Sequence, residues 1–484
     1  MILAVTEAIV SKAFLERLLD GEKLKYCYEC GICTSSCPMA DLLGKDYNPR
    51  VLLEKIILEP EKVLESSELW FCAWCYVCYR RCNQGLKLPE MFLEMRKIAV
   101  DHELVQSHER ALQKIVERVP LPIVATLTCF HPERAGLDRE KVLAKVERMY
   151  DAFLKKEKAK RAQKVAEEKI AVIGSGPAGL TVAYELSRKG YGVTVFESLP
   201  EAGGMLRKCI PSFRVPKQYL EKEIQFIKDL GVEIKTGVGI GQDLSFSQLW
   251  REGYKAVFVG VGAHKAQRMN IEGGELEGVM HALDFLWSLN SGEDVKIGDN
   301  VVVIGGGNVA VDAARGALIA GVALKRGAKS VTILYRRSKE EMPAIPLEVD
   351  EAEKEGVKIE FLVSPKKIVG EKGKVCGVEC VRMQLDEHDE SGRRKAVPIA
   401  GSEFRRDADM VILAIGETPD VEFLPKEILL NETGTVWTDP VTMETSVNGV
   451  FAGGDVVTGP ATVIEAIVGG KHAAESIENY LRSA

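Results

Sequence analysis

The chain has 484 residues, of which 46% are hydrophobic and 28% are charged. These are values of a globular protein with enough chain for about three domains. The net charge of −7 is spread over mixed charges, so nothing suggests binding to nucleic acid. No apolar run approaches the length of a membrane span. The N-terminal stretch MILAVTEAIVSKAF lacks the basic start of a signal peptide, so we expect a cytoplasmic protein.

Residues 1–26 are expected to be helical, and two tight groups of cysteines follow them. Eight of the twelve cysteines lie in these groups, and each group reads C-x2-C-x2-C-x3-C. This run is typical of bacterial ferredoxins, in which the fourth cysteine of each run binds the other 4Fe–4S cluster. We therefore predict two clusters. The ligands are Cys27, Cys30, Cys33 and Cys82 for one cluster, and Cys72, Cys75, Cys78 and Cys37 for the other.

Zinc is the alternative for these cysteines. Clustered cysteines in a cytoplasmic chain favour metal over disulfides. Structural zinc sites pair two C-x2-C halves, so three cysteines at two-residue spacing in each group fit zinc poorly. One departure from the ferredoxin run is Asn83, which stands where a proline would follow the last cysteine.

Residues from about 20 to 140 resemble the small iron–sulfur subunit of heterodisulfide reductases. The resemblance rests on YCYECGICTSSCP, CAWCYVCYRRC, LKLPEMFLEMRKIAV and FHPERAGLD. It implies an α-helical domain over residues 1–140 that carries electrons through two clusters and has no substrate of its own. Residues 141–168 contain neither glycine nor proline and have apolar residues at steps of three and four, so we expect a helical linker there.

The stretch from Ile170 to Glu197 reads as strand, glycine turn, helix and strand, with G-x-G-x-x-G at Gly174, Gly176 and Gly179. In a dinucleotide site the first glycine permits the turn, the second lets backbone approach a pyrophosphate, and the third lets helix and strand pack closely. The helix N-terminus favours phosphate. Glu197, at the end of the second strand, can accept a ribose 2′-OH. The alternative is that this glycine turn serves packing alone and binds no dinucleotide.

A second unit of the same kind begins at residue 299, where DNVVVIGGGNVA carries G-x-G-x-x-A at Gly305, Gly307 and Ala310. Its second strand, SVTILY, runs into Arg336 and Arg337 in place of an acid. Arginines suit a 2′-phosphate through charge-assisted bonds, so we predict NADP(H) over NAD(H) at this site. The first site is then assigned to FAD. The alternative is that the two arginines lie in a solvent-exposed turn and bind no phosphate.

Residues 166–484 resemble the small subunit of glutamate synthase and, equally, the large subunit of NADH-dependent ferredoxin:NADP oxidoreductase. The resemblance rests on GSGPAGL, GGMLRKCIPSFRVPK, VVVIGGGNVAVDAARGA, SVTILYRRSKEEMPA, ESGRRKAVPIAGSEF and FAGGDVVTGPATVIEAI. It implies an α/β flavoprotein with two dinucleotide-binding, Rossmann-like domains. We place the FAD domain at 169–290 and 410–484, and the inserted NADPH domain at 291–409.

The resemblance also implies which residues bind the two cofactors. Those expected at FAD are Gly174, Gly176, Ala178, Gly179, Glu197, Gly203, Gly204, Gly454, Asp455 and Thr462. Those expected at NADPH are Gly305, Gly307, Asn308, Val309, Arg336 and Arg337. Cys209 stands where that family usually has glycine, and a redox role for it is disfavoured because no C-x-x-C partner exists.

The chemistry of such a chain belongs to its cofactors, so we expect no catalytic side chain. We expect an NAD(P)H:acceptor oxidoreductase in which FAD converts the two electrons of a hydride into single electrons for the clusters. Its partners are expected to be other subunits of an electron-transfer complex of heterodisulfide reductase or bifurcating type, with ferredoxin as a further candidate. Two alternatives stay open: a glutamate synthase small subunit and a non-catalytic electron relay.

Overall fold

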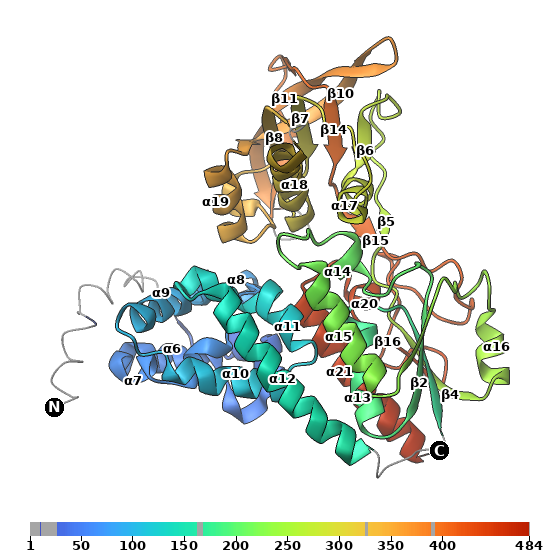
Figure 1. Ribbon diagram of the computed structural model, residues 1–484. Coiled ribbons are helices and arrows are strands. Elements are labelled where there is room, and N and C mark those ends of the chain that lie inside the picture. Colours follow the sequence, from blue (N-terminus) through green and yellow to red (C-terminus); the bar gives the residue numbers. More distant parts are fainter. Residues whose placement is uncertain (1–9, 11–26, 162–167, 325–327, 389–392, 484) are drawn as a thin grey trace. The chain divides into compact units, whose positions relative to one another are not determined.

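The computed structural model describes residues 10, 27–161, 168–324, 328–388 and 393–483. The helix expected over residues 1–26 therefore lies outside the described residues, apart from residue 10. The chain forms two compact units, drawn in Figure 1. The first unit comprises Met1–Gly203, Lys217–Gly262 and Val421–Ala484, and the second comprises Gly204–Pro216 and Ala263–Asp420.

The N-terminal part of the first unit is helical throughout its described residues. Its α-helices are α4 (Ile32–Ser35), α5 (Pro38–Leu43), α6 (Pro49–Leu58), α7 (Pro60–Leu64), α8 (Val77–Arg81), α9 (Leu88–Asp101), α10 (Gln106–Arg118), α11 (Pro122–Ala125) and α12 (Arg139–Arg161). Several of them begin at a proline, whose fixed φ suits the first helical position. Asn48 caps α6, since its side chain accepts hydrogen bonds from Arg50 N and Val51 N.

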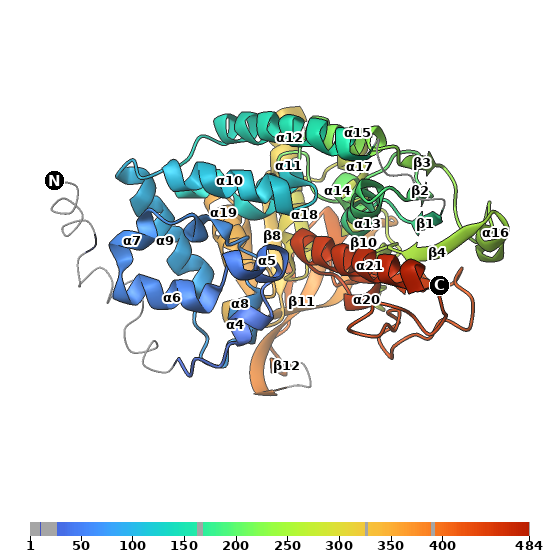
Figure 2. The ribbon, with the colours of Figure 1, turned by 90° about the horizontal axis from the view of Figure 1, so that it is seen from below.

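The expected linker is a helix that packs along much of its length. In α12, Tyr150 meets Phe226 edge to face, with ring centroids 4.7 Å apart. The same helix contacts α10 and α11, as Figure 2 shows. The side chain of Tyr150 is fully buried. This helix is therefore part of the core of the first unit, while residues 162–167 lie outside the described part of the chain.

The remainder of the first unit is a five-stranded parallel sheet with the order β16-β4-β1-β2-β3. The strands are β1 (Lys169–Ile173), β2 (Gly192–Glu197), β3 (Glu233–Thr236), β4 (Tyr254–Val259) and β16 (Val450–Ala452). Its helices are α13 (Pro177–Arg188), α15 (Lys217–Asp229), α16 (Phe246–Arg251), α20 (Asp455–Thr458) and α21 (Val463–Ser483). Helix α13 packs against α21 and α15 (Figure 1).

The second unit holds another five-stranded parallel sheet, with the order β6-β14-β7-β8-β9. The strands are β6 (Val279–His281), β7 (Asn300–Ile304), β8 (Ser330–Tyr335), β9 (Lys358–Phe361) and β14 (Met410–Leu413). Its helices are α14 (Met205–Lys208), α17 (Ala282–Ser291), α18 (Asn308–Leu324) and α19 (Pro346–Glu355). Antiparallel strands complete it: β10 (Val363–Glu371), β11 (Lys374–His388), β12 (Arg394–Pro398), β13 (Phe404–Arg406) and the pair β5 (Lys265–Ala266) and β15 (Glu417–Thr418).

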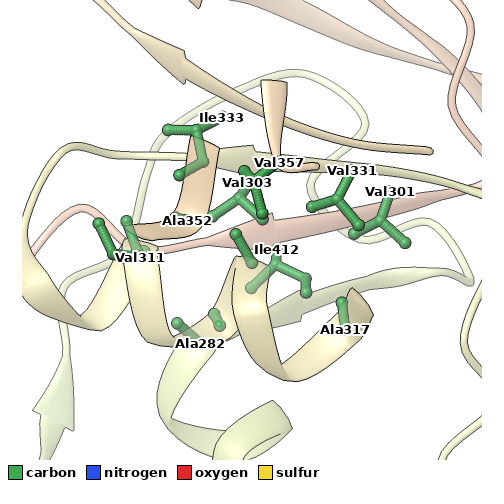
Figure 3. Close-up of a cluster of buried hydrophobic side chains, with 14 of the residues drawn as sticks. Ala282, Val301, Val303, Val311, Ala317, Val331, Ile333, Ala352, Val357 and Ile412 are labelled. Atoms are coloured by element: carbon green, nitrogen blue, oxygen red, sulfur yellow. The ribbon is translucent and has the colours of Figure 1, made fainter. Parts of the chain in front are cut away.

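The second unit has a hydrophobic core between its parallel sheet and its helices. Branched side chains of the sheet, such as Val303 and Ile412, lie over small residues of the helices, such as Ala282 of α17 and Ala317 of α18 (Figure 3). Strand β6 pairs with β14, so β6 and α17 belong to this unit. The larger segment of this unit runs from Ala263 to Asp420, and the inserted NADPH domain at 291–409 stays a prediction.

Candidate functional site

The first glycine turn follows β1 and is shaped by backbone contacts. Gly174 has φ of +97°, and a Cβ added there would lie 2.5 Å from the carbonyl oxygen of Gly260. A Cβ on Gly179 would lie 2.0 Å from the carbonyl oxygen of Gly174. A Cβ on Gly176 would meet no atom within 4 Å. The first and third glycines are thus required by packing, and the second leaves open space at the N-terminus of α13, where a pyrophosphate is favoured.

Glu197 lies at the end of β2 and joins two loops through Ser175. The Ser175 hydroxyl donates to Glu197 Oε2 at 2.5 Å and accepts from Gly203 N at 2.9 Å. Leu199 N donates to the other carboxylate oxygen at 2.8 Å. Glu197 therefore orders the site as well as standing where a ribose hydroxyl is expected. We did not predict a role for Ser175 from the sequence, although its position between two glycines of the motif was a signal for it.

The C-terminal segment meets the first glycine turn through close contacts between small residues. Gly454 has φ of +76°, and a Cβ added there would lie 2.9 Å from Ala178 Cβ. A Cβ on Gly470 of α21 would lie 2.4 Å from the carbonyl oxygen of Ala178. Ala178 is therefore held by packing on two sides, and its contribution to a cofactor would come from its backbone.

Asp455 and Thr462 lie at the beginning of the last two helices. Asp455 Oδ1 accepts from Ala461 N at 3.3 Å. Thr462 caps α21, because its hydroxyl accepts from Glu465 N at 3.4 Å and its own N–H donates to Glu465 Oε2 at 3.1 Å. Both residues follow β16 on the side where the parallel strands of this sheet end. Ligands of open parallel sheets bind at that edge.

The second glycine turn has the same construction in the second unit. Gly305 has φ of +148°, and a Cβ added there would lie 2.1 Å from the carbonyl oxygen of Ala414. A Cβ on Gly307 would meet no atom within 4 Å, and Ala310 is fully buried. The Asn308 side chain accepts from Ile345 N at 2.9 Å and so holds a loop of its own unit beside the turn. Val309 is half-buried beside it.

The two arginines after β8 differ in their surroundings. Arg336 is exposed, whereas Arg337 is buried and donates from Nε to the carbonyl oxygen of Arg394 at 2.7 Å. Burial raises the pKa of Tyr335. The positive charges of Arg393, Arg337 and Arg336 oppose that rise, which indicates that all three side chains lie near the Tyr335 ring. The sequence prediction treated the pair alike and missed Arg393, although the motif SGRRK contains it.

Four cysteines line one cavity of the helical domain, together with Tyr28, Arg50 and Asn83. We call these four the open cysteine group; its members are Cys27, Cys30, Cys33 and Cys82. Burial raises the pKa of the Cys33 thiol, and the other three members of the group add to the rise. The structure thus brings together the four residues that were predicted to bind one cluster.

The other four cysteines also lie near one another. We call them the buried cysteine group; its members are Cys37, Cys72, Cys75 and Cys78. Burial raises the pKa of Cys37 to about 12, and Cys72 adds to the rise. Burial is also the main cause that raises the pKa of Cys78, and the neighbouring thiols of Cys72, Cys75 and Cys37 add to that rise. Each group therefore has four thiols, the number that a 4Fe–4S cluster requires, although no three cysteine, histidine or carboxylate side chains of the described residues are arranged to hold a single metal ion.

Cys209 is a core thiol of the second unit. It is buried within that unit's hydrophobic cluster, and burial raises its pKa to about 12. A thiol in such apolar surroundings is inert because the reactive thiolate is disfavoured.

Comparison with known proteins identifies two families in the chain. Residues 168–470 match the family described as pyridine nucleotide-disulphide oxidoreductase, and residues 23–86 match the 4Fe-4S dicluster domain. These matches confirm the expected α/β fold with two dinucleotide-binding regions and the N-terminal iron–sulfur domain. Among the described residues, no helix is both long and apolar enough to cross a membrane.

Three relatives of the chain have named functions. The beta subunit of NADP(+)-dependent formate dehydrogenase from Moorella thermoacetica is 49% identical over 318 residues, which are 65% of this chain and 44% of that protein. The beta subunit of NADPH-Fe(3+) oxidoreductase from Geobacter sulfurreducens is 34% identical over 518 residues, 99% of this chain and 74% of that protein. The NADPH glutamate synthase small chain of Escherichia coli is 38% identical over 331 residues, 65% of this chain and 69% of that protein. The chain thus spans less than half of the first relative.

Two solved structures share the fold of the dinucleotide-binding part. FprA from Mycobacterium tuberculosis, in complex with NADPH, has a TM-score of 0.55 at 24% identity, covering 66% of this chain and 86% of that one. Thioredoxin reductase from Lactococcus lactis has a TM-score of 0.50 at 22% identity, covering 66% of this chain and all of that one.

Proposed function

We propose, on the premise that the chain belongs to the pyridine nucleotide-disulphide oxidoreductase family and carries a 4Fe-4S dicluster domain, that it is the NADPH-dependent electron-transfer subunit of a larger complex. The observation that carries the proposal is that one chain holds two open glycine turns and two groups of four cysteines. Bound FAD would exchange a hydride with NADPH and single electrons with the clusters.

The first unit is proposed to bind FAD. The turn at Gly176 and the N-terminus of α13 would receive the pyrophosphate, and Glu197 would accept a ribose hydroxyl while Ser175 holds its carboxylate in place. The other residues proposed for this site are Gly174, Ala178, Gly179, Gly203, Gly204, Gly454, Asp455 and Thr462. The support is geometric, because the backbone is open at Gly176 and closely packed at Gly174 and Gly179.

The second unit is proposed to bind NADPH. The turn of Gly305, Gly307, Asn308 and Val309 would hold the pyrophosphate, and exposed Arg336 would pair with the 2′-phosphate. Buried Arg337 would position this loop through its bond to the Arg394 carbonyl. The charge of nearby Arg393 adds to the attraction for a phosphate. Three relatives whose names include NADPH or NADP(+) support this nucleotide.

The partner of this chain is proposed to be another subunit of an electron-transfer enzyme. The relatives are named as beta subunits or small chains, so multi-subunit enzymes are the setting of this family. The Geobacter relative aligns over 99% of this chain, which includes the cysteine groups. A formate-oxidising subunit, as in the Moorella relative, and a bifurcating or heterodisulfide reductase-like complex are candidate partners, as is ferredoxin.

A glutamate synthase small subunit is the second candidate, favoured by 38% identity to the Escherichia coli small chain. That similarity covers 65% of this chain. Co-purification with a glutamine-hydrolysing subunit and NADPH-dependent glutamate formation would establish this function. Failure of NADPH to bind would instead favour the non-catalytic relay.

The proposed function is tested by anaerobic titration of the purified protein with NADPH, followed through the visible absorption of the flavin. We expect bleaching by NADPH that is lost in Gly307→Asp, since a carboxylate would then stand in the open turn where the pyrophosphate is expected. Flavin content should not change. Asn270→Asp is the matched control, because it adds the same charge at an exposed position of the second unit. Wild-type flavin that NADPH leaves oxidised would refute the proposal.

A further inference from the structure

The two cysteine groups differ in their relation to the ligand-binding edge of the first sheet. Strands β1, β4 and β16 run parallel, and the turns at Gly174, Gly260 and Gly453 follow their carboxyl ends. Helix α21 begins beyond the last of these turns, at Val463. Its residue Gly470 packs on the backbone of Ala178 in the helix of the first glycine turn. The N-terminus of α21 therefore lies at the edge where a bound flavin is expected.

The first turn of α21 also meets the helical domain. It contacts the segment Thr126–Phe130, and the backbone N–H of Ile464 lies within hydrogen-bonding reach of the buried Cys129 thiol. The helical domain thus touches the helix that borders the proposed FAD site.

One member of the buried cysteine group is tied to the same helix. Cys37 is the N-cap residue of α5, and α5 packs against α21. Between these helices, His472 Nε2 lies 2.9 Å from Asp41 Oδ1. The packing of α5 on α21 therefore places Cys37 next to the helix that borders the proposed FAD site.

The open cysteine group is more exposed than the buried group, in which Cys72 and Cys78 are buried and Cys37 and Cys75 are half-buried. Cys30 is exposed, and Tyr28 beside it has 74% of its surface exposed. Cys33 lies in α4, and α4 contacts α8, which carries Cys78, and α5, whose N-cap residue is Cys37. The buried group is therefore connected to α21 through α5 and to the open group through α4.

We propose that the buried cysteine group holds the cluster next to FAD, and that the open cysteine group holds the cluster at which electrons enter or leave the chain. This order rests on the proposed function, which did not distinguish the two clusters. A single electron passes between FAD and the buried cluster, and an equal electron passes between the open cluster and an external one-electron carrier. Each cluster is reduced and reoxidised by one electron, so no further reactant is needed.

The order is tested by removing one cluster at a time from the full chain. The double variant Cys27→Ala and Cys30→Ala should lose about half of the iron and keep its flavin. Electrons are placed on the bound flavin by anaerobic illumination with EDTA, and cluster reduction is followed by electron paramagnetic resonance. We expect the remaining cluster to be reduced as fast as in the wild type, while reduction of cytochrome c by the chain is lost.

The double variant Cys75→Ala and Cys78→Ala should behave in the opposite way. Its remaining open cluster should be reduced by dithionite added from outside but not by illumination of the flavin. Should this buried variant fail to fold, the open-group variant decides alone: if its remaining cluster no longer accepts electrons from the flavin, the proposed order is overturned. Cys376→Ala, a half-buried thiol of the second unit, is the control and should leave both clusters and cytochrome c reduction unchanged.

Illumination also separates this inference from the proposed function. If NADPH fails to bleach the wild-type flavin but illumination reduces the clusters in the stated order, the proposed function falls and the cluster order stands. If NADPH bleaches the flavin but loss of the open group stops reduction of the other cluster, the function stands and the cluster order is wrong.

Discussion

The two parallel sheets of this chain have equivalent orders over four strands, β4-β1-β2-β3 and β14-β7-β8-β9, with a glycine turn after the central strand of each sheet. Their edge strands differ, because β16 comes last in its sheet along the chain and β6 comes first. They differ where the second strand of the motif ends. In the first unit that strand ends at Glu197, and in the second it runs into Arg336. They also differ at the third motif position, which is Gly179 in one unit and Ala310 in the other. The comparison indicates that one scaffold serves two nucleotides through a few side chains at its edge.

A further difference lies in what surrounds each sheet. The first unit also contains the helical domain, in which α12 contacts α13, α11 contacts α15 and α5 contacts α21. The second unit carries antiparallel strands instead. The same parallel sheet is thus combined with electron-carrying helices in one unit and with a β-layer in the other.

The largest expected effect comes from giving the first turn the residue type of the second. Gly179→Ala would place a Cβ 2.0 Å from the Gly174 carbonyl oxygen, so we expect a loss of about 3 kcal/mol or more in stability and loss of flavin. The reciprocal change, Ala310→Gly, should cost about 1 kcal/mol and leave flavin bound. Urea unfolding and flavin content measure both. Equal effects of the two variants would contradict the comparison.

Glu223 tests the attachment of the helical domain to the first unit. Its buried Oε1 accepts from Ile123 N at 2.5 Å and from Val124 N at 3.3 Å. Glu223→Ala would leave these N–H groups unpaired, so we expect a loss of about 2 to 3 kcal/mol in stability. Urea unfolding should detect this loss in the first unit.

The same carboxyl should make stability depend on pH. Burial raises the pKa of Glu223 to about 8 from about 4.5, despite the two N–H bonds that lower it. The folded state therefore holds this proton more tightly than the unfolded state does. The resulting stability is present below pH of about 4.5 and is lost as pH rises through about 8. Glu223→Gln should flatten this dependence in unfolding measured across that range, and an unchanged slope would exclude Glu223 as its source.

Arg336 tests the difference at the strand ends. Arg336→Asp would replace a positive charge by a negative one, so kcat/KM for NADPH should fall about 100-fold, equivalent to about 2.7 kcal/mol, while that for NADH is kept. Arg251→Asp, on exposed α16 of the first unit, is the matched control. Arg337→Ala should instead lower stability, because it removes a buried hydrogen bond. A preference for NADPH that survives Arg336→Asp would remove the basis for assigning this site to the 2′-phosphate.

The smallest effect is expected at His472, which joins α21 to α5. The hydrogen bond with Asp41 raises the pKa of His472, and partial burial opposes the rise. Its contribution to stability is thus present below pH of about 6.5 and is lost as pH rises through the higher folded-state pKa. His472→Gln should lower stability by less than about 1 kcal/mol on the acidic side and leave it unchanged on the alkaline side. His102→Gln, an exposed histidine, serves as the control in thermal unfolding.

Much of the fold follows from local sequence. The two glycine turns, their flanking strands and the crossed cysteine groups were predicted because each motif depends on residues a few positions apart. The pairing of β6 with β14 was not predicted, because it joins strands from distant parts of the chain. Ser175 and Arg393 were also missed, because their contacts come from segments far away in sequence.

The sequence by itself determined the kinds of chemistry available: thiols in ferredoxin spacing, two dinucleotide turns, and an acid in one unit where the other has arginines. These properties are local, because spacing and residue type decide them. Only the tertiary structure decided which arginine is exposed, which cysteines are buried, and which cysteine group lies against α21. Burial and proximity depend on packing between segments that are distant in the chain, and no local pattern encodes them.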